Sequence, residues 1–237
     1  MDELSWLGIM RHGESVGNRA ADQAEAAGVE TLDIATSDAD TPLSEIGRRQ
    51  ARHAGQWVDT LPSGQQPSLI VSSTYLRAAQ TARSFCSHMN APPPLMFDER
   101  LRDRELGILD GLTSRGVTAR HPDEIARRRR LGKFYYRPPS GESWADVALR
   151  LRLFLSDLRG SYPRERVLLV SHEAPVLLMR YLIEDLTVAE LLALAGRRLA
   201  NASLTSWELS DGQLQLEAFG TDIAAESGVR STRQTHV

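Results

Sequence analysis

The sequence predicts an α/β fold, in which helices flank both faces of a doubly wound, mostly parallel sheet. Three short apolar segments, near 5–10, 68–73 and 166–171, have the composition of buried strands. Each precedes a segment whose apolar residues recur at helical spacing, and strands alternating with helices are typical of a parallel sheet. With 237 residues, of which 41% are hydrophobic, the chain is long enough to bury a substantial core.

Composition and charge argue against several classes of partner. The net charge is −3, whereas a dedicated nucleic-acid binder is normally strongly basic. No apolar run approaches the ~18 residues of a membrane span, so no membrane partner is expected. The single cysteine, Cys86, supports neither an internal disulfide nor a cysteine-based metal site. The acidic start Met1–Leu4 does not resemble a signal peptide, and we expect a cytoplasmic protein. Oligomeric state is not indicated.

The first strand leads directly into two chemically capable side chains. Arg11 and His12 follow the apolar run, and Gly13 begins a polar turn. In open α/β sheets, ligands bind beyond the carboxyl ends of the strands. An imidazole with its ordinary pKa of ~6.5 is a competent nucleophile near neutral pH, and a neighbouring guanidinium suits a phosphate. This pattern predicts covalent phosphoryl transfer.

The second predicted strand also ends close to a cation. Before it, helices are expected from Arg19 to Gly28 and from Ser44 to about Asp59, separated by an irregular segment over 29–43. Arg77 falls in the first turn of the helix that follows the strand. A cation there opposes the helix macrodipole, whereas the amides of that turn favour an anion. Arg77 is therefore either a solvated charge or a group that holds an anion.

A charged stretch over 101–107 follows a short predicted strand at 95–97. If its backbone is extended, Asp103 and Glu105 lie on one face. Such carboxylates among arginines often form only surface ion pairs. The alternative is a general acid, which phosphoryl transfer through a histidine needs for the leaving oxygen.

Residues 107–142 show no strand pattern, and we interpret them as a lid over the site. Their helical part contains the run Arg127–Arg130, which is either a solvated helix face or an electropositive rim that attracts phosphorylated substrates. The specificity candidates in this segment are Lys133, Tyr135, Tyr136 and Arg137.

The remaining elements complete a single domain over 1–220. Ser143 begins a long amphipathic helix, and the strand after it ends at a second histidine, His172. Further helices are expected over 174–184 and 187–195, then a hairpin of strands over 204–209 and 214–219. The polar tail over 221–237 has no periodic apolar pattern and is expected to be flexible.

Several segments together resemble one known family. Ile9–Asn18 matches the first motif of the histidine phosphatase superfamily, the phosphoglycerate-mutase-like proteins: an aliphatic residue, any residue, Arg-His-Gly-Glu, three residues and Asn. Segments 41–51 and 72–82 and the pair Ser171–His172 resemble its later motifs in the expected order. The resemblance covers about residues 5–210.

This resemblance implies hydrolysis of a phosphomonoester, a small phosphorylated metabolite, through a phosphohistidine on His12. It implies that Arg11, Arg77 and His172 surround the phosphoryl oxygens. No metal or cofactor is expected, because the arginines neutralise the developing charge. The expected proton donor is Asp103, and the expected substrate-binding residues are Ser15, Asn18 and Glu105.

The chain departs from the family pattern at two positions. Asp103 stands where the family usually has Glu, so either Asp103 or Glu105 donates the proton, and we favour Asp103. Glu173 follows the late histidine, where the family usually has Gly. We expect this carboxylate either to disturb phosphate binding or to raise the pKa of His172.

Two other functions remain open from the sequence. A phosphomutase shares the first half-reaction but passes the phosphoryl group to a sugar-acid hydroxyl instead of water. The residues after Asp103 do not resemble the Tyr-Gly-Gly-Leu type of run in the mutases, which favours a hydrolase. The second alternative is a catalytically weak protein that binds a phosphorylated ligand.

Overall fold

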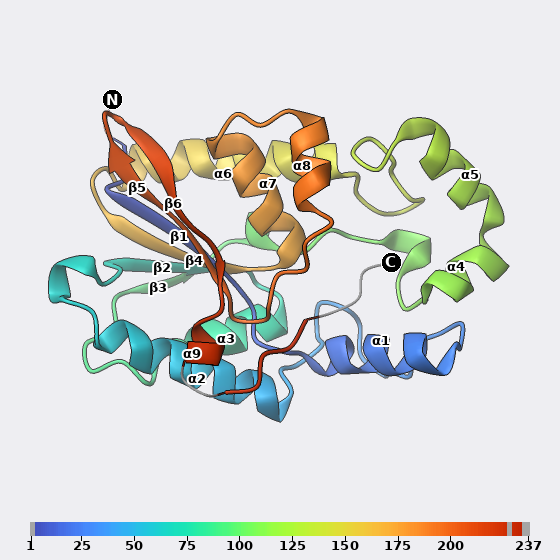
Figure 1. Cartoon of the computed structure of the whole chain (residues 1–237), viewed down its shortest axis with the longest axis horizontal. Helices are drawn as coiled ribbons and strands as arrows, with labels where there is room; N and C mark the ends of the chain where they lie inside the picture. Colours follow the sequence, from blue (N-terminus) through green and yellow to red (C-terminus); the bar gives the residue numbers. More distant parts are fainter. Residues whose placement is uncertain (1–2, 227–228, 234–237) are drawn as a thin grey trace.

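The computed structural model describes residues 3–226 and 229–233, and a six-stranded sheet forms its centre (Figure 1). The strand order is β3-β2-β4-β1-β5-β6. The first four of these are mutually parallel, and β5 runs antiparallel to both β1 and β6. The strands are β1 (Trp6–Arg11), β2 (Leu69–Ser72), β3 (Leu95–Phe97), β4 (Arg166–Ser171), β5 (Leu204–Ser210) and β6 (Gln213–Thr221).

Helices cover both faces of this sheet, as Figure 1 shows. One face packs against α6 (Trp144–Ser161), α7 (Glu173–Ile183) and α8 (Val188–Leu194). The other packs against α2 (Glu45–Asp59), α3 (Leu76–Cys86) and α9 (Ile223–Glu226). The predicted doubly wound, mostly parallel α/β class is confirmed, including the closing hairpin formed by β5 and β6.

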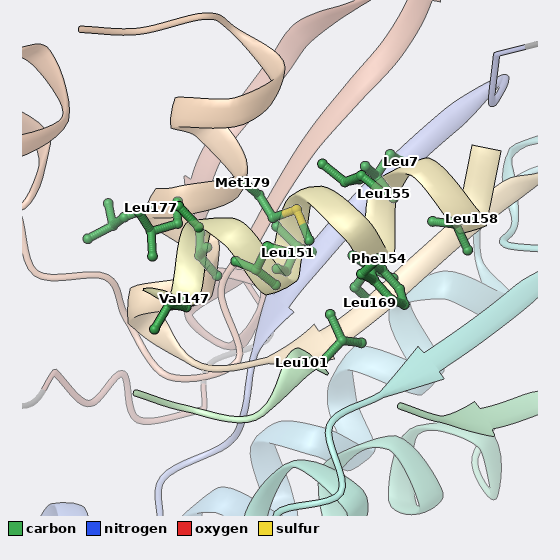
Figure 2. Packing of buried hydrophobic residues seen from close by; sticks show 14 of the residues in the cluster. Leu7, Leu101, Val147, Leu151, Phe154, Leu155, Leu158, Leu169, Leu177 and Met179 are labelled. Carbon is green, nitrogen blue, oxygen red and sulfur yellow. The ribbon is translucent and has the colours of Figure 1, made fainter. Parts of the chain in front are cut away.

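The two cores arise from the alternation of side chains along β1. Leu7 and Ile9 join the cluster under α6 and α7, part of which Figure 2 shows. Trp6 and Met10 join the cluster above α2 and α3. Successive residues of a strand point to opposite faces, so a strand buried on both sides is apolar throughout.

The same alternation continues into the site. Because Arg11 and His12 are consecutive, their side chains leave β1 toward opposite faces of the sheet. Arg11 therefore lies on the side of α7, and His12 on the side of α3. In the parallel pairing of β1 with β4, Arg11 is opposite Ser171, so the next residues, His12 and His172, are neighbours.

A close approach between two backbones fixes the loop after His12. Gly47, in the first turn of α2, packs against the backbone of Glu14, and a Cβ on Gly47 would lie 2.0 Å from the Glu14 oxygen. The carboxylate of Glu14 also accepts a hydrogen bond from the Ser44 hydroxyl at 2.6 Å. The start of α2 thus holds the loop after the first histidine in place.

Some elements differ from the sequence predictions. Helix α1 (Val16–Ala27) begins three residues earlier than expected, because Ser15 caps it. Helix α4 (Ser114–Arg120) was not predicted; it buries only Gly116 and Val117, too short an apolar pattern to recognise. The lid segment also contains α5 (Pro122–Leu131).

The described part of the tail that the sequence predicts to be flexible makes contacts with the rest of the structure, and its flexibility stays a prediction. Ile223 is fully buried in the core above α2. Thr232 bonds to Asn201, and the Gln50 amide donates to Thr232. One apolar residue gives no periodicity, which is why the sequence pattern missed this segment. Residues 227–228 and 234–237 of the predicted tail lie outside the described residues.

Within the part of the chain that the structure describes, no helix is long and apolar enough to cross a membrane.

Gly47→Ala tests the close approach at α2. The added methyl group meets backbone atoms of Glu14, which cannot rotate away. We expect the free energy of unfolding to fall by at least ~2 kcal/mol, measured by urea denaturation. Gly160→Ala is the matched control, because nothing lies within 4 Å of the added Cβ. It should leave stability unchanged or raise it by about 0.5 kcal/mol. Equal effects of the two substitutions on stability would contradict the close approach of Gly47 to the backbone of Glu14.

Candidate active site

His12 lies at the carboxyl end of β1 with its ring in a fixed orientation. Its Nδ1 donates to the Gly13 carbonyl at 2.7 Å, and a carbonyl can only accept, so Nδ1 carries the proton. Nε2 then has the lone pair, and Arg77 Nε donates to it at 3.2 Å. The ring is 2% exposed and lines a cavity. The histidine is therefore held with its nucleophilic nitrogen beside a cation.

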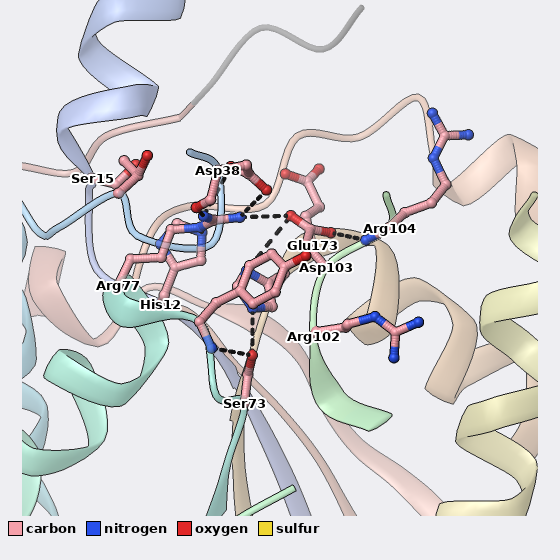
Figure 3. Close-up of polar contacts among 12 residues, drawn as sticks. His12, Ser15, Asp38, Ser73, Arg77, Arg102, Asp103, Arg104 and Glu173 are labelled. Atoms are coloured by element: carbon pink, nitrogen blue, oxygen red, sulfur yellow. Dashed lines mark hydrogen bonds and ion pairs between the residues drawn. The ribbon is translucent and has the colours of Figure 1, made fainter. Parts of the chain in front are cut away.

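His172 lies beside His12, with 5.1 Å between the ring centroids. Its Nε2 is 2.9 Å from the Ser73 hydroxyl, which follows β2 (Figure 3). Its Nδ1 is fully buried and has no hydrogen-bond partner among the described residues. The nearest acid is Asp103, whose Oδ2 lies 3.6 Å from this nitrogen. A buried ring nitrogen without a hydrogen-bond partner is an expected feature of a ligand site.

Both imidazoles are held in the neutral form. Burial lowers the pKa of His12 well below its usual value, and Arg77, His172 and Arg11 lower it further. Burial also lowers the pKa of His172, with contributions from Arg77, Arg150 and Arg11. The expectation that Glu173 raises the pKa of His172 is therefore wrong. The carboxylate of Glu173 faces Arg11 instead.

Arg77 extends from the first turn of α3 and is bound by carboxylates. Its two terminal nitrogens donate to the Asp38 carboxylate at 2.9 and 3.1 Å, and one also donates to Asp103 at 3.3 Å. Burial alone lowers the pKa of Arg77, but these carboxylates outweigh burial and raise it. Burial raises the pKa of Asp38 although Arg77 opposes this. Figure 3 shows the three groups together.

Arg11 lies on the opposite side of β1 and meets the start of α7. It pairs with Glu173 at 2.8 Å, and it also donates to the Leu199 carbonyl. Burial lowers the pKa of Arg11, and the charge of Glu173 opposes that shift. Both side chains line the same cavity as His12. The predicted set Arg11, His12, Arg77 and His172 thus comes together from three parallel strand ends.

The two candidate acids have different positions. Asp103 lines the cavity and contacts Arg77 and His172, as described above. Glu105 is outside the residues described as lining the cavity, and it accepts a hydrogen bond from the Tyr75 hydroxyl. It also lies 3.9 Å from Arg102. The geometry favours Asp103 as the acid, because it reaches the groups that surround the two histidines.

Ser15 and Asn18 also line the cavity, but both have structural partners. The Ser15 hydroxyl accepts from the backbone N–H of Asn18 at 3.0 Å, and Asn18 Oδ1 accepts from the backbone N–H of Ser15 at 2.9 Å. Asn18 Oδ1 also accepts from the Asn201 amide. These two side chains close the capping box of α1, and their role in substrate binding stays a prediction.

Sequence reasoning missed Asp38, Ser73 and Asn201. Asp38 lies in the irregular segment over 29–43, where no periodicity distinguishes one acid from another. Ser73 directly follows β2, and its position beyond a strand end was the one signal that could have identified it. Asn201 donates to the His12 carbonyl from a loop 189 residues away, a contact that only folding creates.

The cavity of about 540 Å³ extends well beyond His12, and three cations form the part of its lining that we call the outer wall. Arg104, Arg128 and Lys133 line it. Burial lowers the pKa of Arg104, and Arg128 lowers it further. Burial likewise lowers the pKa of Lys133, with contributions from Arg128 and Arg104. The three cations are therefore close enough to repel one another.

The lining of the cavity distinguishes the residues of the predicted lid, 107–142, that face the site from those that do not. Within the run Arg127–Arg130, Arg128 lines the cavity, and the other three are exposed. Of the four specificity candidates in the lid segment, Lys133 lines the cavity. Tyr135 is 64% exposed, and the Tyr136 hydroxyl donates to Glu124. Arg137 is exposed and pairs with Asp146.

Comparison with known proteins agrees with this geometry. Glucosyl-3-phosphoglycerate phosphatase of Mycobacterium tuberculosis is 32% identical over 210 residues, which cover 84% of this chain and 83% of that protein. The structure of mycobacterial glucosyl-3-phosphoglycerate phosphatase complexed with VO3 superposes with a TM-score of 0.72 at 29% identity, covering 92% of this chain and all of that one.

Mutases are also among the relatives. A 2,3-bisphosphoglycerate-dependent phosphoglycerate mutase of Gloeobacter violaceus is 31% identical over 64% of this chain and 62% of that protein. The match to 6-phosphofructo-2-kinase/fructose-2,6-bisphosphatase of Caenorhabditis elegans, at 35% identity, spans only 27% of that protein.

The family profile described as histidine phosphatase superfamily (branch 1) matches residues 7–222, which is nearly the whole chain. Together with the paired histidines between two arginines, this match shows that the chain belongs to the histidine phosphatase superfamily.

Proposed function

We propose that the protein is a phosphomonoester hydrolase that acts through a phosphohistidine on His12. The observation that carries this proposal is the 5.1 Å approach of the buried His172 ring to His12, which lines, together with Arg11 and Arg77, a cavity large enough for a metabolite. The similarity to a phosphatase over 84% of the chain supports hydrolysis as the reaction.

In the proposed first step, the lone pair of His12 Nε2 attacks phosphorus. The ring orientation favours this, because the bond from Nδ1 to the Gly13 carbonyl leaves Nε2 unprotonated. A new N–P bond forms while the ester P–O bond breaks. The leaving oxygen takes a proton from Asp103, which must be protonated at that point.

The cationic side chains stabilise the charge that spreads over the phosphoryl oxygens. Arg11 and Arg77 supply guanidinium donors, and Nδ1 of His172, which has no hydrogen-bond partner among the described residues, supplies a further one in the tautomer in which the Ser73 hydroxyl donates to Nε2. Such fixed donors in a buried site stabilise the transition state more than the ground state, and each typically contributes ~3–4 kcal/mol. In the second step, water attacks phosphorus while Asp103 takes its proton; a P–O bond forms, the N–P bond breaks, phosphate is released and His12 is regenerated.

The outer wall supports a substrate that carries a second negative charge. Arg104, Arg128 and Lys133 line the same cavity as His12, and the cavity is far larger than a phosphoryl group requires. A small phosphorylated metabolite with a carboxylate or a second phosphoryl group would contact both regions. This proposal assigns substrate specificity to Lys133 and Arg128 rather than to the other lid candidates, Tyr135, Tyr136 and Arg137.

A phosphomutase is the second candidate, because a mutase is 31% identical over 64% of this chain. It would use the same histidine but transfer the phosphoryl group to a substrate hydroxyl. With 3-phosphoglycerate, a hydrolase releases inorganic phosphate, whereas a mutase yields 2-phosphoglycerate. Binding of phosphate without turnover of any substrate would instead indicate a ligand-binding protein.

His12→Asn should lower kcat for p-nitrophenyl phosphate by at least about 10³-fold, because the nucleophile is lost. Quenching the wild-type reaction with base and mapping peptides by mass spectrometry should locate the phosphoryl group on His12. His88→Gln is the control, since its ring bonds to the Ser84 carbonyl away from the cavity. Retention of full activity by His12→Asn would contradict the proposal.

The pKa of His12 sets the acid limb of activity. A protonated imidazole has no lone pair, and burial together with the nearby cations lowers this pKa well below 6.5. We therefore expect kcat/KM, corrected for substrate ionisation, not to fall as the pH is lowered through 6.5. NMR titration of the ring carbon, assigned with His12→Asn, should show a neutral ring at pH 6. A titration of the His12 ring centred near ~6.5 would contradict the lowered pKa.

Arg128→Gln tests the second charge on the substrate. We expect the ratio of kcat/KM for 3-phosphoglycerate to that for glycerol 3-phosphate, which lacks the carboxylate, to fall about tenfold. Arg129→Gln removes the same charge from an exposed neighbour on α5 and should leave the ratio unchanged. Equal ratios in the two variants would show that Arg128 does not recognise a second anionic group on the substrate.

A further inference from the structure

Glu173 occupies an unexpected place for a carboxylate in a phosphate site. It is the first residue of α7 and directly follows His172. It is buried and lines the same cavity as His12. One of its oxygens lies 2.8 Å from Arg11, and the other accepts from the Leu199 N–H at 3.4 Å. A negative charge thus lies on a guanidinium that faces the phosphoryl group.

The orientation of Arg11 does not depend on this carboxylate alone. The same terminal nitrogen of Arg11 donates to the Leu199 carbonyl, and its own backbone N–H bonds to the Ser203 carbonyl. A neutral acceptor and the end of β1 therefore already fix the side chain. What Glu173 adds is its charge.

That charge changes the charge balance of the inner pocket, by which we mean the part of the site around His12, His172, Arg11 and Arg77. Among the described residues, the guanidiniums of Arg11 and Arg77 face the carboxylates of Glu173, Asp38 and Asp103. The two imidazoles are neutral because burial lowers their pKa values. In a buried site, where charges are poorly screened, a carboxylate that faces one of these guanidiniums weakens the binding of a phosphate dianion.

We propose that Glu173 is a specificity-determining residue of the phosphoryl pocket, which offsets the charge of Arg11 and so keeps the affinity for free phosphate low. Phosphate, the product of the proposed hydrolysis, then leaves readily, and a phosphorylated substrate must gain affinity from contacts outside the inner pocket. This inference rests on the proposed function.

The test is the affinity for inorganic phosphate and for vanadate. Glu173→Gln keeps the shape and removes the charge, and its inhibition constants against p-nitrophenyl phosphate hydrolysis should fall at least tenfold. Glu173→Asp keeps the charge and should remain near the wild type. Glu184→Gln is the matched control, because Glu184 pairs with Arg180 on the same helix but lies outside the described lining of the cavity. It should leave both constants unchanged.

The direction in which the affinity for phosphate changes in Glu173→Gln tests the proposal. Unchanged or weaker phosphate binding by Glu173→Gln overturns the proposal, and weaker binding would mean that Glu173 serves to position Arg11. If Glu173→Gln does not fold, as judged by circular dichroism, Glu173→Gly supplies a second neutral variant. Calorimetric titration with phosphate gives the affinity without turnover. A wild-type protein that fails to hydrolyse p-nitrophenyl phosphate would contradict the proposed function, whereas equal calorimetric affinities contradict the role of Glu173.

Discussion

The parallel pairing of β1 with β4 is the constraint on which the site depends. Its register places Arg11 opposite Ser171, and hence His12 beside His172. A shift of one residue would turn one of the two imidazoles to the other face of the sheet. Close packing on both faces opposes that shift, because it would exchange Leu7 and Ile9 in one core with the differently shaped Trp6 and Met10 in the other. The hydrophobic cores therefore determine the spacing of the two histidines.

Burying this many ionisable groups requires mutual compensation. An unpaired guanidinium in a buried pocket loses much of its hydration free energy, so each of the two arginines has a carboxylate partner. The histidines meet the same cost in another way, by remaining neutral. A neutral His12 is also what nucleophilic attack needs. The burial that destabilises charge thus prepares the ring for the proposed chemistry.

The inner pocket and the outer wall are built from different parts of the chain. Strand ends and the helices that follow them supply the groups around the histidines, on a rigid frame. Arg128 and Lys133 come from the lid segment, on α5 and just after it. Under the proposed function, this division separates the reaction from the choice of substrate, since substitutions in this segment can alter the wall without moving the strand ends.

The sequence by itself determined the fold class and the residues able to do chemistry, because strands buried on both faces and helix caps leave local patterns. It also placed Arg11, His12, Arg77 and His172 near strand ends. Only the tertiary structure decided that Asp103 and not Glu105 lies near His172, that Asp38 binds Arg77, and that Glu173 faces Arg11. These contacts join segments far apart in the chain, and their geometry follows from how the elements pack, which no local pattern encodes.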